Sequence, residues 1–369
     1  MGLRIAMVLP ALPRTGGEAR AAINLAAGWL GLGHAVEMVF LRQSGAPPHP
    51  LPPGLTTLEL GAAEGEGFRP LAGYLAERRP HLLFSTTHQA NMAALLARRL
   101  ARRRVPLVVR AADFVSRRVS KPALREQVWR QMQQAYPRAD VILAGCGAVA
   151  DEVALQARIP RERIQVVPAA LNLPVIARAA AQPPPHPWFT DVAEPVLLSV
   201  GALSYSKNHA LALWAFALLR RRRPAKLVIL GEGRMRPRLE ALARRLGLRH
   251  DVALPGFLPN PFACMRHADV LVHAARWESS GNALAEALAC GLPVVCVAAP
   301  GAAPEILANG RYGTLVPTRE PADLAQAILA ALDAPPPPEP LVRRARDFGH
   351  LRTARHVLRL VRAARPELG

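Results

Sequence analysis

Short apolar runs alternate with amphipathic helical patterns along the whole chain of 369 residues. In the first half, residues 4–9, 36–41 and 81–85 have the length and composition of buried strands. Residues 19–32 repeat apolar positions at helical spacing and are followed by Gly33, a typical helix terminator. Strand and helix patterns that alternate in this way predict an α/β fold built on parallel sheets.

The alternation restarts after a proline-rich segment. Residues 182–187 have the sequence Gln-Pro-Pro-Pro-His-Pro, which is the composition of a semi-rigid linker. Each half is large enough for a core of its own. We therefore expect two domains, residues 1–181 and 188–349, followed by a basic helical tail, residues 350–369, that can cross back to the first domain.

Residues 276–295 combine a loop, a helix start and two carboxylates. A buried-strand pattern ends just before them, and a helix is expected from about Asn282 to the Gly-Leu-Pro sequence at 291–293. Glu278 and Glu286 bracket the helix start, eight positions apart. Backbone amides at a helix N-terminus favour bound anions. A ligand with a phosphate for the amides and hydroxyls for the carboxylates would satisfy this stretch, and a nucleotide sugar is such a ligand.

Three glycine turns follow predicted strands. Gly16-Gly17 follows the first strand, Gly201 opens the loop that carries Lys207, and Gly231-Glu232-Gly233 follows the next strand. Glycine lets a backbone approach a phosphate closely, and a lysine at a loop end delivers a compact positive charge. Taken alone, Gly16-Gly17 is better explained as an ordinary strand-to-helix turn, because the dinucleotide G-x-G-x-x-G spacing is absent there. Lys207 alone is equally well explained as a solvated loop lysine.

The net charge of +20 is carried almost wholly by arginine. Such a charge attracts nucleic acid or an anionic membrane surface, although arginines spread over many helices are also typical of a merely solvated surface. No zinc-finger spacing or aromatic-basic RNA-binding signature accompanies the charge. An anionic membrane surface is therefore the favoured candidate partner, and nucleic acid is not expected.

The remaining composition indicates a cytoplasmic protein. Together with the basic charge, it is consistent with a peripheral position on the inner face of the membrane. No window has the pattern of a membrane span, and residues 1–13 are interpreted as a first strand rather than a signal peptide. The cysteines lack metal-ligand spacing and lie within or beside apolar segments, so we expect reduced core thiols. They are Cys146, Cys264, Cys290 and Cys296.

The order and spacing of the motifs in the second half resemble the retaining nucleotide-sugar glycosyltransferases of the GT-B fold, family 4 (glycosyl transferases group 1). Gly16-Gly17 and residues 23–26 fit the same family more loosely. The resemblance implies an α/β GT-B fold, with a Rossmann-like acceptor domain and a Rossmann-like donor domain that face each other across a closing cleft. The motifs that carry it lie at residues 199–201, 207–208, 229–233, 254–257, 268–270, 278–286, 291–295 and 304–306.

The resemblance also implies roles for single residues. Lys207 would pair with the donor diphosphate and stabilise the leaving nucleotide. Glu286 would accept the ribose hydroxyls, and Glu278 would hold hydroxyls of the transferred sugar, close to the developing positive charge. No Asp-x-Asp motif is present, so we expect neither a metal nor a cofactor. The other donor-binding candidates are Gly16, Gly17, Glu232, Phe257, Leu258, Gly281, Asn282, Ala283 and Leu284.

The chain departs from the family pattern at several places, which include Ala169 and Asn172 after the strand near Val167. Ala202 stands where the family usually has arginine, and Ala112 lies where a histidine would be sought. We therefore take His88 and Arg110 as acceptor-side candidates, and Asp113 as a further catalytic candidate for the acceptor hydroxyl. For His88 the alternative of a loop or capping histidine is the simpler one.

Three hypotheses follow. The leading one is a retaining glycosyltransferase that moves a hexose from a nucleoside-diphosphate sugar, most simply UDP-linked, to a hydroxyl of a cell-envelope glycan or lipid-linked acceptor. The second is a catalytically weakened nucleotide-sugar-binding subunit or regulator, which Ala202 and Ala112 would mark. The third, nucleic-acid binding, depends on charge alone and ranks last.

Overall fold

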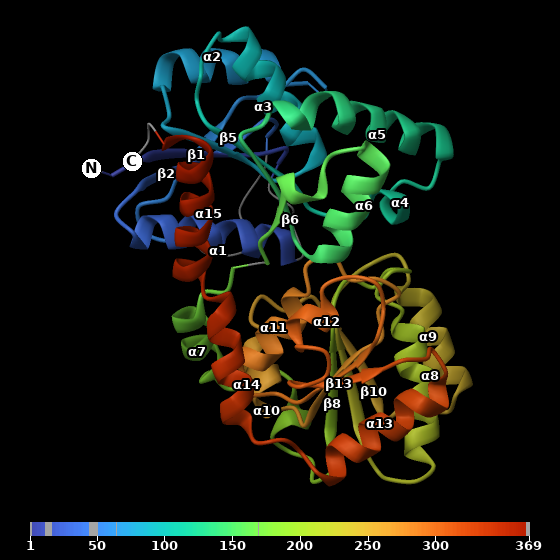
Figure 1. The fold of residues 1–369 in the computed structure, drawn as a ribbon. Helices are drawn as coiled ribbons and strands as arrows, with labels where there is room; N and C mark the ends of the chain where they lie inside the picture. Colours follow the sequence, from blue (N-terminus) through green and yellow to red (C-terminus); the bar gives the residue numbers. More distant parts are fainter. Residues whose placement is uncertain (1, 12–16, 44–50, 64, 169, 367–369) are drawn as a thin grey trace. The chain divides into compact units, whose positions relative to one another are not determined.

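The structure, a computed structural model, describes residues 2–11, 17–43, 51–63, 65–168 and 170–366 (Figure 1). The chain divides into two compact units, residues 1–170 with 350–369, and residues 171–349. Each unit is built on one parallel sheet with helices packed on it, so the predicted α/β class with two Rossmann-like domains is confirmed.

The first unit contains a seven-stranded parallel sheet with the strand order β3-β2-β1-β4-β5-β6-β7. Its central strands are continuous apolar runs because helices cover both faces of a parallel sheet. The edge strand β3 was not predicted, since its residues are largely exposed and polar. The strands are β1 (Arg4–Leu9), β2 (Ala35–Phe40), β3 (Thr56–Glu59), β4 (Leu82–Ser85), β5 (Leu107–Ala111), β6 (Val141–Ala144) and β7 (Ile164–Val166).

The core of the first unit joins the two ends of the chain. The buried ring of Trp29 meets Phe84 edge to face at a centroid distance of 5.3 Å, and its Nε1 donates to the Ala354 carbonyl at 3.3 Å. The C-terminal helix α15 thus packs beside α1 (Figure 1). The helices are α1 (Gly17–Gly31), α2 (Phe68–Arg78), α3 (His88–Leu100), α4 (Val115–Arg118), α5 (Pro122–Ala135), α6 (Gly147–Ala157) and α15 (His350–Ala364), with short 3-10 turns at Tyr136–Arg138 and Arg161–Arg163.

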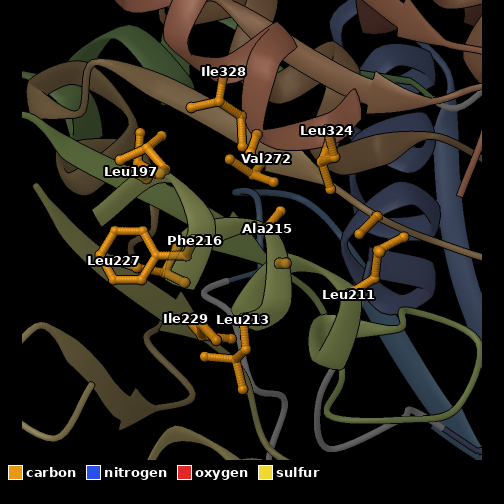
Figure 2. Close-up of a cluster of buried hydrophobic side chains, with 14 of the residues drawn as sticks. Leu197, Leu211, Leu213, Ala215, Phe216, Leu227, Ile229, Val272, Leu324 and Ile328 are labelled. Carbon is orange, nitrogen blue, oxygen red and sulfur yellow. The ribbon is translucent and has the colours of Figure 1, made fainter. Parts of the chain in front are cut away.

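The second unit contains a six-stranded parallel sheet with the order β10-β9-β8-β11-β12-β13. Figure 2 shows part of its core, where Phe216 of α8 and Ile328 of α13 belong to one buried cluster with Leu227 of β9. The strands are β8 (Val196–Val200), β9 (Lys226–Leu230), β10 (Val252–Gly256), β11 (Val270–His273), β12 (Val294–Val297) and β13 (Thr314–Val316).

Helices cover both faces of this second sheet. None of the helices in the described part of the chain has the length and apolar character needed to cross a bilayer. The helices are α7 (Leu173–Ala180), α8 (His209–Arg220), α9 (Arg236–Arg245), α10 (Phe262–His267), α11 (Asn282–Ala289), α12 (Ala303–Ile306), α13 (Pro321–Asp333) and α14 (Pro338–Ala345), with 3-10 turns at Pro187–Phe189 and Arg346–Phe348.

The division between the units differs from the predicted boundary at residue 181, because residues 171–181 belong to the second unit. Helix α7 packs on α10 and α11. The side chain of Asn260 donates to the Ala179 carbonyl at 2.9 Å, and the Leu171 amide donates to the Phe348 carbonyl at 2.8 Å. The proline-rich segment therefore lies within the second unit, while the tail from residue 350 groups with the first.

Gly28 allows the close approach of α1 and α15. A Cβ atom there would lie 2.6 Å from the His350 carbonyl oxygen and 2.9 Å from the Ala354 Cβ, whereas a Cβ on Gly73 in α2 would meet nothing within 4 Å. We predict that Gly28→Ala lowers the free energy of unfolding by about 1–3 kcal/mol, since α15 must shift. The control Gly73→Ala should raise it by about 1 kcal/mol. Urea unfolding followed by circular dichroism tests both, and equal effects would contradict this packing.

Candidate functional site

A lysine and a carboxylate from two loops of the second unit form the centre of the candidate site. Lys207 lies in the loop after β8, and its Nζ forms an ion pair with Oε2 of Glu278, which follows β11. Both loops leave the carboxyl ends of parallel strands, where ligand sites of open α/β sheets occur. The structure therefore brings the two predicted catalytic residues of the second half into direct contact.

The backbone fixes Glu278 in place. Its amide donates to the Pro300 carbonyl at 3.1 Å, and its carbonyl accepts from the Ala302 amide at 2.7 Å. Gly301 lies directly opposite with φ +132°, and a Cβ atom there would be only 1.8 Å from the Glu278 carbonyl oxygen. Only glycine fits this approach, so the loop after β12 holds the loop after β11.

The Glu278 carboxylate is buried, with 5% of the residue exposed. Its Oε1 accepts from the Gly281 amide at 3.0 Å, and its Oε2 lies 3.1 Å from Nε2 of His273. Burial alone would raise the pKa of Glu278, but the Lys207 ammonium, with a smaller contribution from His273, outweighs it and holds that pKa well below its ordinary value. Glu278 is therefore a fixed negative charge at neutral and mildly acidic pH.

The start of α11 carries the other candidates of this stretch. Since the Gly281 amide donates to Glu278, the structure gives it an internal partner in place of the predicted phosphate. Asn282 and Ala283 form the first turn of α11 with half-buried side chains, and the Leu284 side chain is fully buried. Leu284 can thus reach a ligand only through its backbone.

Glu286 lies one turn inside α11 and is also buried, with 4% exposed. Its charge acts on Cys290 at the end of the helix: burial, and then the Glu286 carboxylate, raises the pKa of that thiol to about 12. Two buried carboxylates, Glu278 and Glu286, therefore flank the first turn of the same helix. The cysteines are free and buried, as expected.

The glycine turn at Gly231 contacts the Lys207 loop, which begins at Gly201. The Leu203 amide donates to the Glu232 carbonyl at 2.9 Å, and the Gly231 amide donates to the Gly256 carbonyl at 2.8 Å. A Cβ atom on Gly231, whose φ is +146°, would lie 2.0 Å from the Gly201 carbonyl oxygen. These contacts tie together the loops that follow β8, β9 and β10.

The donor candidates on these loops differ in their surroundings. The Glu232 carboxylate binds the Arg236 guanidinium at 2.9 Å and 2.5 Å, and the hydrogen bond from Arg236 lowers the pKa of Glu232. Phe257 and Leu258, which follow β10, are half-buried. The structure thus gives Glu232 an arginine partner of its own.

Two histidines of the site were missed from the sequence, because they lie in segments that are otherwise apolar. His273 ends β11, and only 4% of it is exposed. His209 begins α8, is equally buried, and has its Nδ1 3.1 Å from the Ser199 hydroxyl. Burial, and then the Lys207 charge, lowers the pKa of His209 to about 4. His209 is therefore neutral at pH 7.

The first-half candidates fall into two places. Gly16 lies outside the described residues, and Gly17 begins α1. His88 begins α3 with its Nε2 3.0 Å from Gln131 Oε1 and its Nδ1 3.3 Å from the Tyr136 hydroxyl. Burial lowers the pKa of His88. Thr87 is the N-cap of α3, and the His88 side chain contacts residues of the first unit itself.

Arg110 and Asp113 lie at and after the end of β5. The Arg110 carbonyl accepts from the Asn91 side chain at 2.9 Å, and Arg110 lines a small pocket of the first unit with Phe84 and Thr353. Asp113 is 3.1 Å from the Arg118 guanidinium and accepts from the amide of the next residue. Within the described ranges, no group of three or more His, Cys, Asp or Glu side chains is placed to hold a metal ion.

Two family models match successive parts of this chain. The model described as "Glycosyl transferases group 1" matches residues 186–348, and the model described as "Glycosyl transferase 4-like domain" matches residues 16–170. With the two parallel-sheet units and the site above, these matches show that the chain belongs to the family 4 glycosyltransferases of the GT-B fold.

Particular relatives are similar in part. One relative is the N-acetylgalactosamine-N,N'-diacetylbacillosaminyl-diphospho-undecaprenol 4-alpha-N-acetylgalactosaminyltransferase of Campylobacter jejuni. The two chains are 32% identical over 200 residues, and this matched region covers 54% of this chain and 52% of that protein. The chain thus spans about half the length of such curated relatives.

Solved structures share the fold over nearly the whole chain. The sucrose-phosphate synthase of Thermosynechococcus elongatus matches with a TM-score of 0.80 and 19% identity, covering 98% of each chain. Anabaena HepE, solved in complex with UDP and glucose, matches with a TM-score of 0.75 and 18% identity, covering 97% of this chain and 98% of that one.

His209 gives the site a pH-dependent contribution to stability. Its folded pKa of about 4 lies below its ordinary value of 6.5, so the unfolded chain takes up the proton first as the pH falls. We predict that the wild-type protein loses up to about 3 kcal/mol of unfolding free energy through this group between pH 6.5 and pH 4. In His209→Gln that part of the loss should vanish. Urea unfolding at several pH values measures the free energy of unfolding of both proteins. The same dependence of this free energy on pH in both would contradict the prediction.

Proposed function

We propose that this protein is a retaining glycosyltransferase that moves a hexose from a UDP-sugar to a hydroxyl of a cell-envelope glycan or lipid-linked acceptor. The observation that carries the proposal is the ion pair between partly buried Lys207 and buried Glu278, just before the start of α11. A charged carboxylate and an ammonium at this edge of a parallel sheet match the two chemical parts of a nucleotide sugar, its hydroxyls and its diphosphate.

Each charge has a role in the proposed reaction. Lys207 turns from Glu278 to the diphosphate and stabilises the negative charge that develops as the glycosidic bond breaks. Glu278, kept ionised by its surroundings, accepts hydroxyls of the transferred sugar and lies near the positive charge that develops on it. Glu286 accepts the ribose hydroxyls. The acceptor hydroxyl attacks from the side of the departing phosphate, which takes its proton, so no carboxylate nucleophile is needed.

The choice of donor and acceptor draws on the similar proteins. UDP is present in the structure of Anabaena HepE, and the name of the Campylobacter jejuni relative describes transfer to a diphospho-undecaprenol-linked sugar. The net charge of +20 would suit an anionic membrane surface. We therefore propose a cytoplasmic enzyme, peripheral on the inner face of the membrane, that extends a lipid-linked glycan.

Metal independence is part of the proposal. Lys207 and the helix start at Asn282 supply positive charge and dipole for the leaving diphosphate, which is the task that a divalent cation performs in other transferases. The residues proposed for this task all lie on the second unit.

A second candidate function is a nucleotide-sugar-binding subunit without efficient transfer. The observations that favour it lie on the first unit, where Asp113 contacts Arg118, and His88 contacts Gln131 and Tyr136. Such a protein would keep the donor site and lack an acceptor-activating group.

A donor-hydrolysis assay tests the proposal. The protein is incubated with a panel of nucleotide sugars in EDTA, with and without lipid extract as acceptor, and release of the nucleotide is measured. We expect slow hydrolysis of a UDP-sugar by the wild-type protein. In Glu278→Gln the rate of hydrolysis should fall by about tenfold to a hundredfold, because the charge facing the sugar is lost. The control Glu339→Gln changes an exposed glutamate of the same unit and should leave the rate unchanged.

The outcomes separate the candidates. Tight donor binding without turnover under any condition would favour the binding subunit over the enzyme. Turnover that appears only after Mg²⁺ is restored would contradict metal independence. No binding of any nucleotide sugar would overturn both candidates.

A further inference from the structure

One oxygen of the Glu278 carboxylate has two neighbours that can donate to it. Oε2 pairs with the Lys207 ammonium and also lies 3.1 Å from Nε2 of His273. The other oxygen, Oε1, accepts from the Gly281 amide at 3.0 Å. Lys207 and His273 therefore approach the same atom, and the departure of one leaves the other beside it.

The two neighbours of Oε2 differ in their access to solvent. The Lys207 side chain is 23% exposed, whereas the side chains of Glu278 and His273 are 6% and 5% exposed. Because a flexible four-carbon stem carries the ammonium, a ligand that approaches from solvent can draw Lys207 away. Such a ligand does not reach the His273 ring, which stays beside Glu278.

The backbone holds His273 in place. It is the last residue of β11, an inner strand of the second sheet, and it pairs in register with Cys296 of β12. The Cys296 thiol donates to the Val297 carbonyl at 3.2 Å, so this neighbouring donor is engaged elsewhere. The His273 ring, and not this thiol, is therefore the donor available to Glu278.

The contact between His273 and Glu278 is close without being a complete hydrogen bond. Within the described residues, Nε2 of this buried ring has no hydrogen bond of regular geometry. Buried polar groups in folded proteins are generally hydrogen-bonded, so this nitrogen is short of a partner. The Lys207 ammonium holds the oxygen that His273 approaches, and the hydrogen bond can form fully once Lys207 has left.

We propose that His273 is a positioning residue that takes over Oε2 of Glu278 when Lys207 turns to the donor diphosphate. The inference rests on the proposed function, because a diphosphate is the group that draws Lys207 away. With the proton on Nε2, the neutral ring donates to Oε2 while the Gly281 amide donates to Oε1, so the carboxylate keeps its direction. The place on Oε2 that Lys207 leaves then accepts a hydroxyl of the transferred sugar.

The proposed exchange affects the binding of UDP itself. A buried carboxylate that loses its cation and gains no other donor is strongly destabilised. UDP draws Lys207 away from Glu278 but carries no transferred sugar whose hydroxyls could replace it. The affinity for UDP therefore isolates the contribution of His273 from that of the sugar hydroxyls.

Calorimetric titration of the full chain with UDP tests the proposal. Two amides are compared at one position: His273→Gln places a donor near the position of Nε2, whereas the shorter His273→Asn reaches only as far as Nδ1. Each change is measured in the wild-type background and in Glu278→Gln, where no carboxylate charge remains to be held. Thermal unfolding verifies that the variants are folded, and His273→Leu replaces His273→Asn if that variant does not fold.

We expect His273→Asn to weaken UDP binding by about tenfold, because Glu278 then lacks a donor when Lys207 leaves. His273→Gln should stay within about threefold of wild type, since it keeps a donor in reach. In the Glu278→Gln background the asparagine change should alter UDP affinity by less than about twofold, because the two residues act through one contact.

Three results would overturn the proposal. Unchanged UDP affinity in His273→Asn would remove the role of the ring. Equal losses in both backgrounds, or equal losses for asparagine and glutamine, would assign His273 a merely structural role while the proposed function stands. A wild-type protein that binds neither UDP nor any nucleotide sugar would refute the proposed function and the inference with it, a result that differs from both of the others.

Discussion

The second unit is organised around a carboxylate that is both buried and charged. Glu278 has lost its hydration, and the compensation comes from the Lys207 ammonium, the Gly281 amide and the nearby ring of His273. Removing one partner from a buried pair of this kind typically costs about 3–5 kcal/mol, because the remaining charge is left uncompensated. A ligand that draws Lys207 away must therefore supply hydrogen-bond donors to Glu278, and sugar hydroxyls are such donors.

The glycine positions of the unit support that arrangement. Gly301 lets the loop after β12 contact the backbone of Glu278, and Gly231 lets the loops after β8 and β9 interlock. A side chain at Gly301 would meet the Glu278 carbonyl oxygen at 1.8 Å, so the loop after β12 would have to move away from the Glu278 loop. A side chain at Gly231 would meet the Gly201 carbonyl oxygen at 2.0 Å, so the loop after β9 would have to move away from the Lys207 loop. The loops that carry the charged pair are thus held by close backbone contacts to the neighbouring loops.

Much of this could be predicted from local patterns. Parallel strands and the helix from Asn282 follow from apolar runs and glycine turns, and the motif order assigns Lys207 and Glu278 to one donor site. The ion pair between them was not predicted. Features that depend on tertiary contacts could not. The partner of the Gly281 amide is set by where the Glu278 side chain folds back, and the boundary at 170 is set by the packing of α7 on α10 and α11. His209 and His273 are hidden in apolar segments, where a sequence pattern does not distinguish a core position from a site.

The most direct measurement is the affinity for UDP, by calorimetry, of Lys207→Met and of Lys226→Met. Both lysines are partly buried and paired with a carboxylate of the second unit, Lys226 with Asp251 at 2.9 Å, but only Lys207 lies at the proposed diphosphate site. The account predicts that Lys207→Met weakens UDP binding by at least tenfold, while Lys226→Met leaves it unchanged. UDP affinity that is unaffected by Lys207→Met, or lowered equally by both changes, would contradict the account.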